Sequence, residues 1–391
     1  MSELRTHSLR HNSAQGNPNI QMYADGSTSI RDLSNANENK IMNSAFRIRQ
    51  RPYNTGTGND SAFAATETRF VQDRWRYYNS AAAPTSGTFL INTIYNSPTG
   101  GTEDLPDSIP SALEMTCSAA FGDTANNAAY LLLGQCIEGY NCYGTGWGTD
   151  GGKPVTLSFW VKSSQTGTYV VTVRNQNGVP TPTMCSYAAT YTISAADTWE
   201  YVTITIPAPP ADDYPWSYTS GLGIEVLWCL ASGSTYQGDT DEWVDGSIFG
   251  GTGTVNDWGV TVGDTFCLTG CQLNVGSGPA QYVLPNVQTE LNQCLRYYYR
   301  SSEYGYLWSG YAAQNAVGYQ RCNYPVPMRT TPVDEGCNGT AIPPSAGFNT
   351  SSFAFATNTS TNTGTTVSMN HTGAANAIGY WYAQMIVSAE L

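Results

Sequence analysis

The sequence predicts an all-β fold: an antiparallel jelly-roll β-sandwich followed by a smaller β-rich C-terminal domain, with an extended N-terminal leader. Several segments alternate apolar and polar residues with the period of two that is typical of half-buried strands. The 391-residue chain contains 39 glycines and 20 prolines, which indicates many turns between short strands. Helical spacing is convincing in one segment only. Together these observations favour a sandwich over a helical class.

The predicted leader covers residues 1–40. It is polar and rich in Asn and Ser, with turn signals at residues 16–18 and 24–26. Because the segment has no apolar set from which to build a core, we expect it to be disordered or ordered by a partner or by copies of itself. The central domain is expected to begin at Ile41.

The strands of the central domain, residues 41–285, follow in order. The clearest covers residues 154–162, and a strand over 169–174 follows a short turn, so we expect these two to form a hairpin. Further alternating strands are predicted over residues 199–206, 222–230 and 264–273. About seven or more strands joined by long loops are typical of a jelly roll.

The C-terminal domain, residues 286–391, is expected to open with a short helical linker. Val287, Leu291, Cys294 and Leu295 recur at helical spacing, and Asn286 is placed to cap the helix. The rest reads as short strands in loops rich in Thr, Asn, Ser and Gly. The expected strand segments are residues 304–320, 321–329, 352–355, 365–370 and 380–391.

Composition excludes several classes of function. The net charge is −13, and Lys occurs only at positions 40, 153 and 162, so no nucleic-acid interface is expected. No apolar run approaches the roughly 18 residues of a spanning helix, so no membrane insertion is expected. The first residues show no secretory signal, which favours maturation in a reducing cytoplasm and free, buried thiols for the ten cysteines. Cys267 and Cys271 are four apart in a predicted strand and are expected on one face.

Several short motifs resemble the tail-fibre-like and other appendage proteins of tailed phages, including their carbohydrate-binding-module-like jelly roll. The motifs are residues 9–13 (LRHNS), 17–20 (NPNI), 24–27 (ADGS), 43–48 (NSAFRI), 157–162 (LSFWVK), 290–291 (EL), 294–299 (CLRYYY), 324–332 (YPVPMRTTP) and 389–391 (AEL). The resemblance implies a virion protein that is a homotrimer. It also implies a leader, residues 1–40, that attaches to other virion proteins of the tail or capsid, and a C-terminal tip that contacts a host cell-surface glycan or protein.

The sequence favours a protein that is not an enzyme. Only three histidines occur, at positions 7, 11 and 371, and no G-x-S-x-G motif is present. The remaining enzymatic alternative is a glycan depolymerase, which needs two carboxylates about 5 to 9 Å apart. Its candidates are Asp212, Asp213, Glu225, Asp239, Asp241, Glu242 and Asp245. Glu225 lies opposite Ile224 and Val226 in its strand, so we expect it to be outward and solvated.

Two kinds of binding site are predicted. Oxygen-rich loops at strand ends can hold a structural calcium, for which Asp239, Asp241, Asp245 and Asp264 are the candidate ligands. The 10 Trp and 26 Tyr exceed what cores use, and such side chains outside a core offer flat faces with a polar edge. The candidate ligand-binding aromatics are Tyr304, Tyr306, Trp308, Tyr311 and Trp381.

The function expected from these features is that of a virion structural protein, a tail-fibre-like appendage that recognises the host surface. One alternative is a capsid fibre or a head decoration or cement protein, which the sequence does not separate from a tail location. The depolymerase is a second alternative, and a free-standing sugar-binding module of a cellular enzyme is a weaker third. Host, receptor and copy number are not encoded in any motif of the chain.

Overall fold

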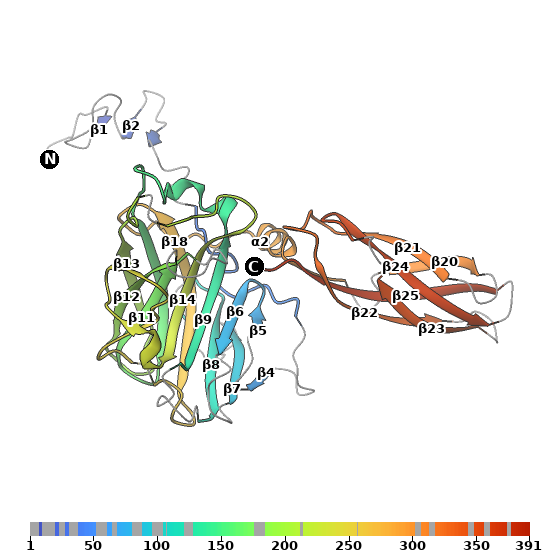
Figure 1. Ribbon diagram of the computed structural model, residues 1–391, viewed down its shortest axis with the longest axis horizontal. Coiled ribbons are helices and arrows are strands. Elements are labelled where there is room, and N and C mark those ends of the chain that lie inside the picture. The colour runs from blue at the N-terminus through green and yellow to red at the C-terminus, as the bar shows by residue number, and fades with distance from the viewer. Residues whose placement is uncertain are drawn as a thin grey trace, which may run out of the picture.

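The computed structural model contains a large β-sandwich and an elongated C-terminal module (Figure 1). It describes residues 8–9, 20–22, 28–30, 38–51, 61–64, 69–79, 88–95, 105–106, 108–120, 128–175, 184–211, 214–255, 257–301, 306–312, 317–342, 348–355, 360–373 and 377–391. Within the leader, β1 (Ser8–Leu9), β2 (Ile20–Met22) and β3 (Thr28–Ile30) pair as one small sheet.

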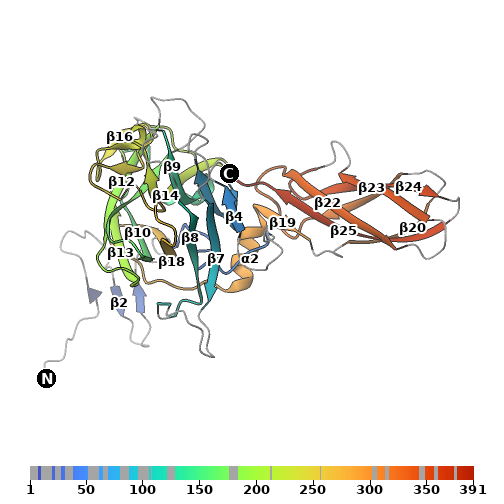
Figure 2. The same ribbon diagram turned by 90° about the horizontal axis from the view of Figure 1, so that it is seen from below.

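Two antiparallel sheets face each other in the sandwich, as two views of the ribbon show (Figures 1 and 2). The six-stranded sheet has the order β13-β10-β18-β8-β7-β4. Its strands are β4 (Ser61–Ala64), β7 (Thr88–Tyr95), β8 (Ser111–Ala119), β10 (Val155–Ser163), β13 (Glu200–Ile206) and β18 (Thr265–Val275). The predicted all-β sandwich is confirmed.

The seven-stranded sheet has the order β16-β12-β11-β14-β9-β6-β5. Its strands are β5 (Arg69–Gln72), β6 (Trp75–Asn79), β9 (Tyr130–Glu138), β11 (Gly167–Arg174), β12 (Cys185–Ile193), β14 (Leu222–Ser232) and β16 (Trp243–Asp245). The loops carry the short elements η1 (Gly139–Asn141), η2 (Tyr143–Thr145), η3 (Ser234–Tyr236), β15 (Gln237–Gly238) and β17 (Gly250–Gly251).

The hairpin expected from residues 154–174 is wrong. β10 pairs with β13 and β18, whereas β11 pairs with β12 and β14, so the chain crosses from one sheet to the other between them. Alternation of residue types reports which side of a strand is buried but not the sheet that the strand joins. Because the inner faces of both sheets contact the same core, a crossing and a hairpin have the same sequence pattern.

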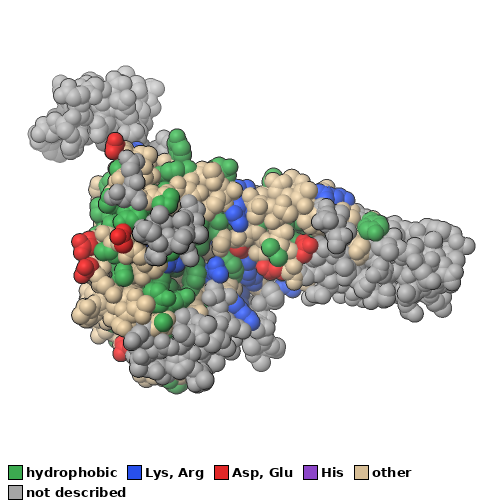
Figure 3. All heavy atoms as spheres, in the orientation of Figure 1, with side chains coloured by type: hydrophobic (Ala, Val, Ile, Leu, Met, Phe, Trp, Pro, Cys, Tyr) green, Lys and Arg blue, Asp and Glu red, His purple; other side chains and the backbone are tan. Residues whose placement is uncertain are grey.

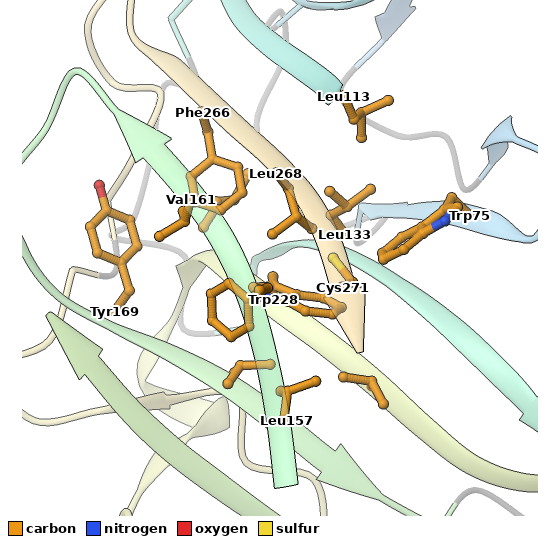
Figure 4. Close-up of a cluster of buried hydrophobic side chains, with 14 of the residues drawn as sticks. Trp75, Leu113, Leu133, Leu157, Val161, Tyr169, Trp228, Phe266, Leu268 and Cys271 are labelled. Atoms are coloured by element: carbon orange, nitrogen blue, oxygen red, sulfur yellow. The ribbon is translucent and has the colours of Figure 1, made fainter. Parts of the chain in front are cut away.

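The main core fills the space between the sheets. In β14, Ile224, Val226, Trp228 and Leu230 point inward and are all buried. The Trp228 ring lies 5.5 Å from that of Trp75, measured between centroids, and Figure 4 shows it among side chains from both sheets. Burial of side chains of this size is the principal stabilising contribution in a sandwich.

A β-bulge in β18 overturns the expectation for Cys267 and Cys271. Gly270 adopts a φ of 59°, and the register with β10 shifts by one residue at this point. The extra residue reverses the alternation, so Cys267 lies outside the main core while Cys271 lies in it, beside Leu268 (Figure 4). The nine cysteines that the structure describes with their side chains are free and buried, as predicted.

The C-terminal module begins with helix α2 (Val287–Leu295), and the Asn286 side chain accepts a hydrogen bond from the backbone N–H of Gln288, as its capping role predicts. Two sheets follow, with strands β19 (Tyr298–Arg300), β20 (Tyr306–Ala312), β21 (Val317–Asn323), β22 (Val333–Ile342), β23 (Phe348–Phe355), β24 (Gly364–Gly373) and β25 (Ala377–Ser388). β22 was not predicted, and the strand expected over residues 321–329 ends at Asn323, shortly before Pro325 and Pro327.

Ion pairs between partly exposed arginines and buried carboxylates fasten the module to the sandwich. The Arg296 guanidinium lies 2.7 Å from the Glu138 carboxylate, and Arg47 lies 2.6 Å from Glu290 of α2. Arg74, buried in the sandwich, donates to Glu390 near the end of the chain. These contacts fix the direction in which the module projects (Figure 1). Among the described residues, no helix is long and apolar enough to cross a membrane.

Candidate ligand-binding face

The outer face of the seven-stranded sheet carries a cluster of aromatic rings that is separate from the main core. Tyr130 at the start of β9 contacts Tyr236 and Phe249, with ring centroids 5.2 Å and 5.5 Å away, respectively. Tyr130 and Tyr236 are half-buried, so part of each ring is open to solvent, whereas Phe249 is buried beneath them. The three rings make an aromatic platform on the sheet.

The platform forms because the residues of the central strands alternate between two apolar sides. In β14, Leu227 and Cys229 point outward where their neighbours point into the core, and they meet Leu132 of β9 and Val170 of β11. This small outer cluster supports Phe249, which arrives from the segment of residues 234–251 that crosses the face. Figure 3 shows hydrophobic side chains gathered on this side of the molecule, with Lys and Arg side chains among them.

A buried ionic group adjoins the platform and corrects the expectation for Glu225. The Glu225 carboxylate does point outward, but it is fully buried: it accepts hydrogen bonds from Arg174 Nε at 2.6 Å and from the Tyr78 hydroxyl at 2.6 Å. The Arg174 guanidinium also lies 4.9 Å from the Phe249 ring centroid and donates to the Ser247 hydroxyl at 2.8 Å. Glu225 is not solvated because residues 234–251 cover it.

Burial governs the chemistry of this group. Burial raises the pKa of Tyr78 well above its usual value, and the phenol therefore stays protonated and donates to Glu225. Burial also raises the pKa of the neighbouring Cys136 thiol to about 12, which leaves it a poor nucleophile at neutral pH. Both oxygens of the Glu225 carboxylate accept a hydrogen bond, one from Tyr78 and one from Arg174. The carboxylate therefore fixes the positions of these two side chains on the outer face of the sheet.

The structure separates the predicted calcium ligands. Asp241 accepts from the backbone N–H of Thr190 at 2.9 Å, and Asp245 accepts from the Tyr214 hydroxyl at 2.5 Å. Asp239 is exposed in the loop before β16, whereas Asp264 precedes β18 in the other sheet. Across the described part of the chain, no group of three or more His, Cys, Asp or Glu side chains could hold a metal ion. Asp212 and Asp213 lie outside the described residues.

The predicted tip aromatics lie in the C-terminal module. Tyr304 is outside the described residues, and Tyr306, Trp308 and Tyr311 belong to the backbone of β20. Trp308 is directly opposite Trp381 in the β20–β25 register, and the role predicted for these aromatics in binding stays a prediction. The pairing brings together two residues that are far apart in the sequence.

The sequence reasoning missed the platform on the sandwich. Tyr130 and Phe249 belong to segments without clear alternation, and the pattern around Arg174 predicts a strand but no partner for its charge. One sequence signal does point to the platform. β14 has apolar residues at both its inward and its outward positions, which indicates that both sides of this central strand are covered.

Comparisons with known proteins find similar folds. No family model matches the chain, and no curated protein matches it in sequence. Among solved structures, it is similar to the enzymatically active domain of tailspike protein 4 of bacteriophage CBA120, with 14% identity and a TM-score of 0.28 over 52% of this chain and 19% of that chain. It is also similar to the family 11 carbohydrate-binding module of Clostridium thermocellum in complex with a β-1,3-1,4-mixed-linked tetrasaccharide, with 13% identity and a TM-score of 0.24 over 57% of this chain and 98% of that chain.

A third similar structure is the N-terminal tandem of two CBM22 modules from Paenibacillus barcinonensis, with 9% identity and a TM-score of 0.24 over 87% of this chain and 100% of that chain. The match to the tailspike spans about a fifth of that protein's domain. At these identities and TM-scores the likenesses assign neither a family nor an activity to the chain.

Proposed function

We propose that this chain is a non-enzymatic recognition protein whose sandwich binds a cell-surface glycan. The observation that carries the proposal is the platform of Tyr130, Tyr236 and Phe249 beside the Arg174–Glu225 pair. Aromatic faces stack on the apolar side of a sugar ring, and phenol hydroxyls at their edges hydrogen-bond to its polar rim. A half-buried pair of tyrosines on a rigid sheet offers both at low entropic cost.

The absence of catalysis is part of the proposal. Glycoside hydrolysis needs two carboxyl groups across a scissile bond. Among the candidate carboxylates that the structure describes, Glu225 is bound by Arg174 and Tyr78, while Asp241 and Asp245 accept hydrogen bonds from Thr190 and Tyr214. Each of these carboxylates is therefore already engaged by a donor of the protein itself.

We further propose that the chain acts as a tail-fibre-like appendage of a phage virion. The sequence motifs that resemble such appendages support this role, as does the projecting C-terminal module, which ion pairs hold to the sandwich (Figure 1). A fixed projection is suited to presenting a tip away from a particle. In this role residues 1–40 attach the chain to other virion proteins, and the oligomer that the resemblance implies is a homotrimer.

Two readouts on one preparation test these proposals. The purified chain is screened against a panel of bacterial surface polysaccharides, with binding and newly formed reducing ends measured in parallel. We expect binding without release of reducing ends. Cleavage that is lost in an Asp241→Asn or Asp245→Asn variant would instead establish the depolymerase, and no binding to any polysaccharide would contradict the glycan proposal.

The virion role is tested by immunogold labelling of purified phage particles. Label at the tail is the expected result. Label distributed over the head would support the capsid fibre or decoration alternative, and unlabelled particles would refute a virion role while leaving the glycan proposal intact.

A further inference from the structure

Strand β13 ends the six-stranded sheet with a long, unprotected edge. It lies at the margin of the sandwich away from the C-terminal module in both ribbon views (Figures 1 and 2). Its seven residues pair with β10 on one side without a bulge. Natural sheets usually protect such an edge, because its free backbone groups can pair with another strand.

The hydrogen bonds of β10 reveal which backbone groups of β13 point outward. The Pro154 carbonyl accepts from Gly276 on the β18 side, and the Ser163 carbonyl accepts from Asp197 on the β13 side. Since successive residues of a strand turn their backbone groups to opposite neighbours, the odd-numbered residues of β10 bond to β13. Their register partners are Val202, Ile204 and the other even-numbered residues of β13.

The backbone N–H and C=O groups of Tyr201, Thr203 and Thr205 therefore point away from the sheet. Within the part of the chain that the structure describes, no backbone group forms a hydrogen bond to them on that side. All three residues are exposed. β13 thus presents three consecutive sets of the donors and acceptors that a further antiparallel strand requires.

The side chains of β13 add an apolar reason for pairing. Val202 and Ile204 point toward the main core but are only half-buried, because they lie at the rim of the sandwich. Residues 201–206 carry no charge, no proline and strongly β-favouring side chains. The fully described edges of the other sheet differ: β16 has three residues and ends in Asp245, and β5 contains Arg69 and a register shift.

We propose that β13 is a self-association edge, which pairs antiparallel with β13 of a second copy about a two-fold axis at Thr203. This inference is independent of the glycan proposal. In this register Thr203 faces Thr203 of the second copy, and Tyr201 of each copy faces Thr205 of the other. Each of these three pairs can form two backbone hydrogen bonds, about six in all. Val202 lies opposite Ile204 of the second copy, so each copy covers the open rim of the other.

The self-complementary register favours a second copy as the occupant, and the charge pattern fixes where the two copies can meet. Two chains of net charge −13 repel each other over most of their surfaces, and an uncharged strand is where they approach at least cost. The register also places Glu200 opposite Ile206 of the second copy, so that the two Glu200 carboxylates lie at opposite ends of the pair. We expect added salt to strengthen the association, since it screens the remaining repulsion.

The mass of the full chain in solution tests the inference, measured by light scattering on wild type, Thr203→Pro and Thr203→Val. Proline removes the outward N–H and leaves the β10 pairing intact, whereas valine keeps the backbone donor. We expect wild type and T203V to have twice the mass of T203P at equal concentration. If the leader also forms trimers, the same factor of two separates a hexamer from a trimer.

A second variant protects the test against a folding defect in T203P. Thr203→Glu is a substitution at an exposed position and places two carboxylates face to face at the axis, so it should also halve the mass while the unfolding temperature stays near that of wild type. Equal masses for wild type, T203P and T203E would overturn the inference, whether that common mass is a monomer or a trimer. A wild-type monomer that instead captures an unrelated extended peptide at β13 would overturn it too.

Discussion

The Arg174–Glu225 pair should be a principal determinant of sandwich stability beneath the candidate ligand-binding face. Replacing Glu225 by Ala removes the carboxylate that accepts from both the Tyr78 hydroxyl and Arg174, a residue that is only 6% exposed. Breaking a buried pair by removing one partner costs about 3–5 kcal/mol. We therefore expect the free energy of unfolding to fall by about that amount in Glu225→Ala.

Removing both charges should cost less than removing one. In the double variant Glu225→Met with Arg174→Met, apolar side chains of similar length fill the site, and we expect stability within about 1–2 kcal/mol of wild type. The matched control is Glu242→Ala, an exposed carboxylate whose loss should change stability by less than about 0.5 kcal/mol.

Urea-induced unfolding followed by tryptophan fluorescence measures all four proteins, because Trp75 and Trp228 are buried in the same sandwich. A Glu225→Ala variant within about 1 kcal/mol of wild type would refute the reasoning, since that result requires the pair to be solvated or relaxed. A double variant as unstable as the single one would refute the claim that removal of the Glu225 charge, rather than lost packing, causes the effect.

Two further predictions concern the bulge in β18 and Asp73, which accepts a hydrogen bond from the Gln50 side chain, as does the Tyr298 carbonyl of the C-terminal module. Burial raises the pKa of Asp73 from 3.8 to about 6, so the unfolded chain releases this proton at a lower pH than the folded chain. The contribution of Asp73 to stability is therefore present below about pH 4 and is lost as the pH rises through about 6, a change of about 3 kcal/mol that Asp73→Asn should remove from a plot of unfolding free energy against pH. At the bulge, a Cβ at position 270 would lie 2.8 Å from Ile109 Cδ1 in a backbone of φ 59°, so Gly270→Ala should destabilise by about 1–3 kcal/mol. Gly278→Ala, with no atom within 4 Å of the added carbon, is the control, and equal melting temperatures for the two variants would contradict the role of the bulge.

Much of the fold follows from local sequence patterns. The alternation in β10, β13 and β14 predicts those strands, and the spacing of Val287, Leu291 and Cys294 with the Asn286 cap predicts α2. These features depend on a few neighbouring residues, so the sequence contains all the information they need.

What the sequence did not predict depends on contacts between distant segments. The crossing between β10 and β11 is set by which strands each one pairs with, and the position of Cys267 is set by a single inserted residue at Gly270. Likewise, Glu225 is buried only because residues 234–251 return over its strand and Arg174 arrives from the neighbouring one. β22 was missed because the sequence VDEGCNGTAI has no alternation and is held by its pairing with β25.

The central claim is that the platform binds a glycan. Its most direct test uses one polysaccharide that binds in the screen. Isothermal titration measures its affinity for wild type and for the double variant Tyr130→Ala with Tyr236→Ala. The control is Tyr95→Ala, which removes an exposed tyrosine from β7 in the other sheet. We predict a loss of at least tenfold in affinity for the double variant, with Tyr95→Ala unchanged and all three proteins folded. Equal affinities for the double variant and wild type would contradict a glycan site on the outer face of the seven-stranded sheet.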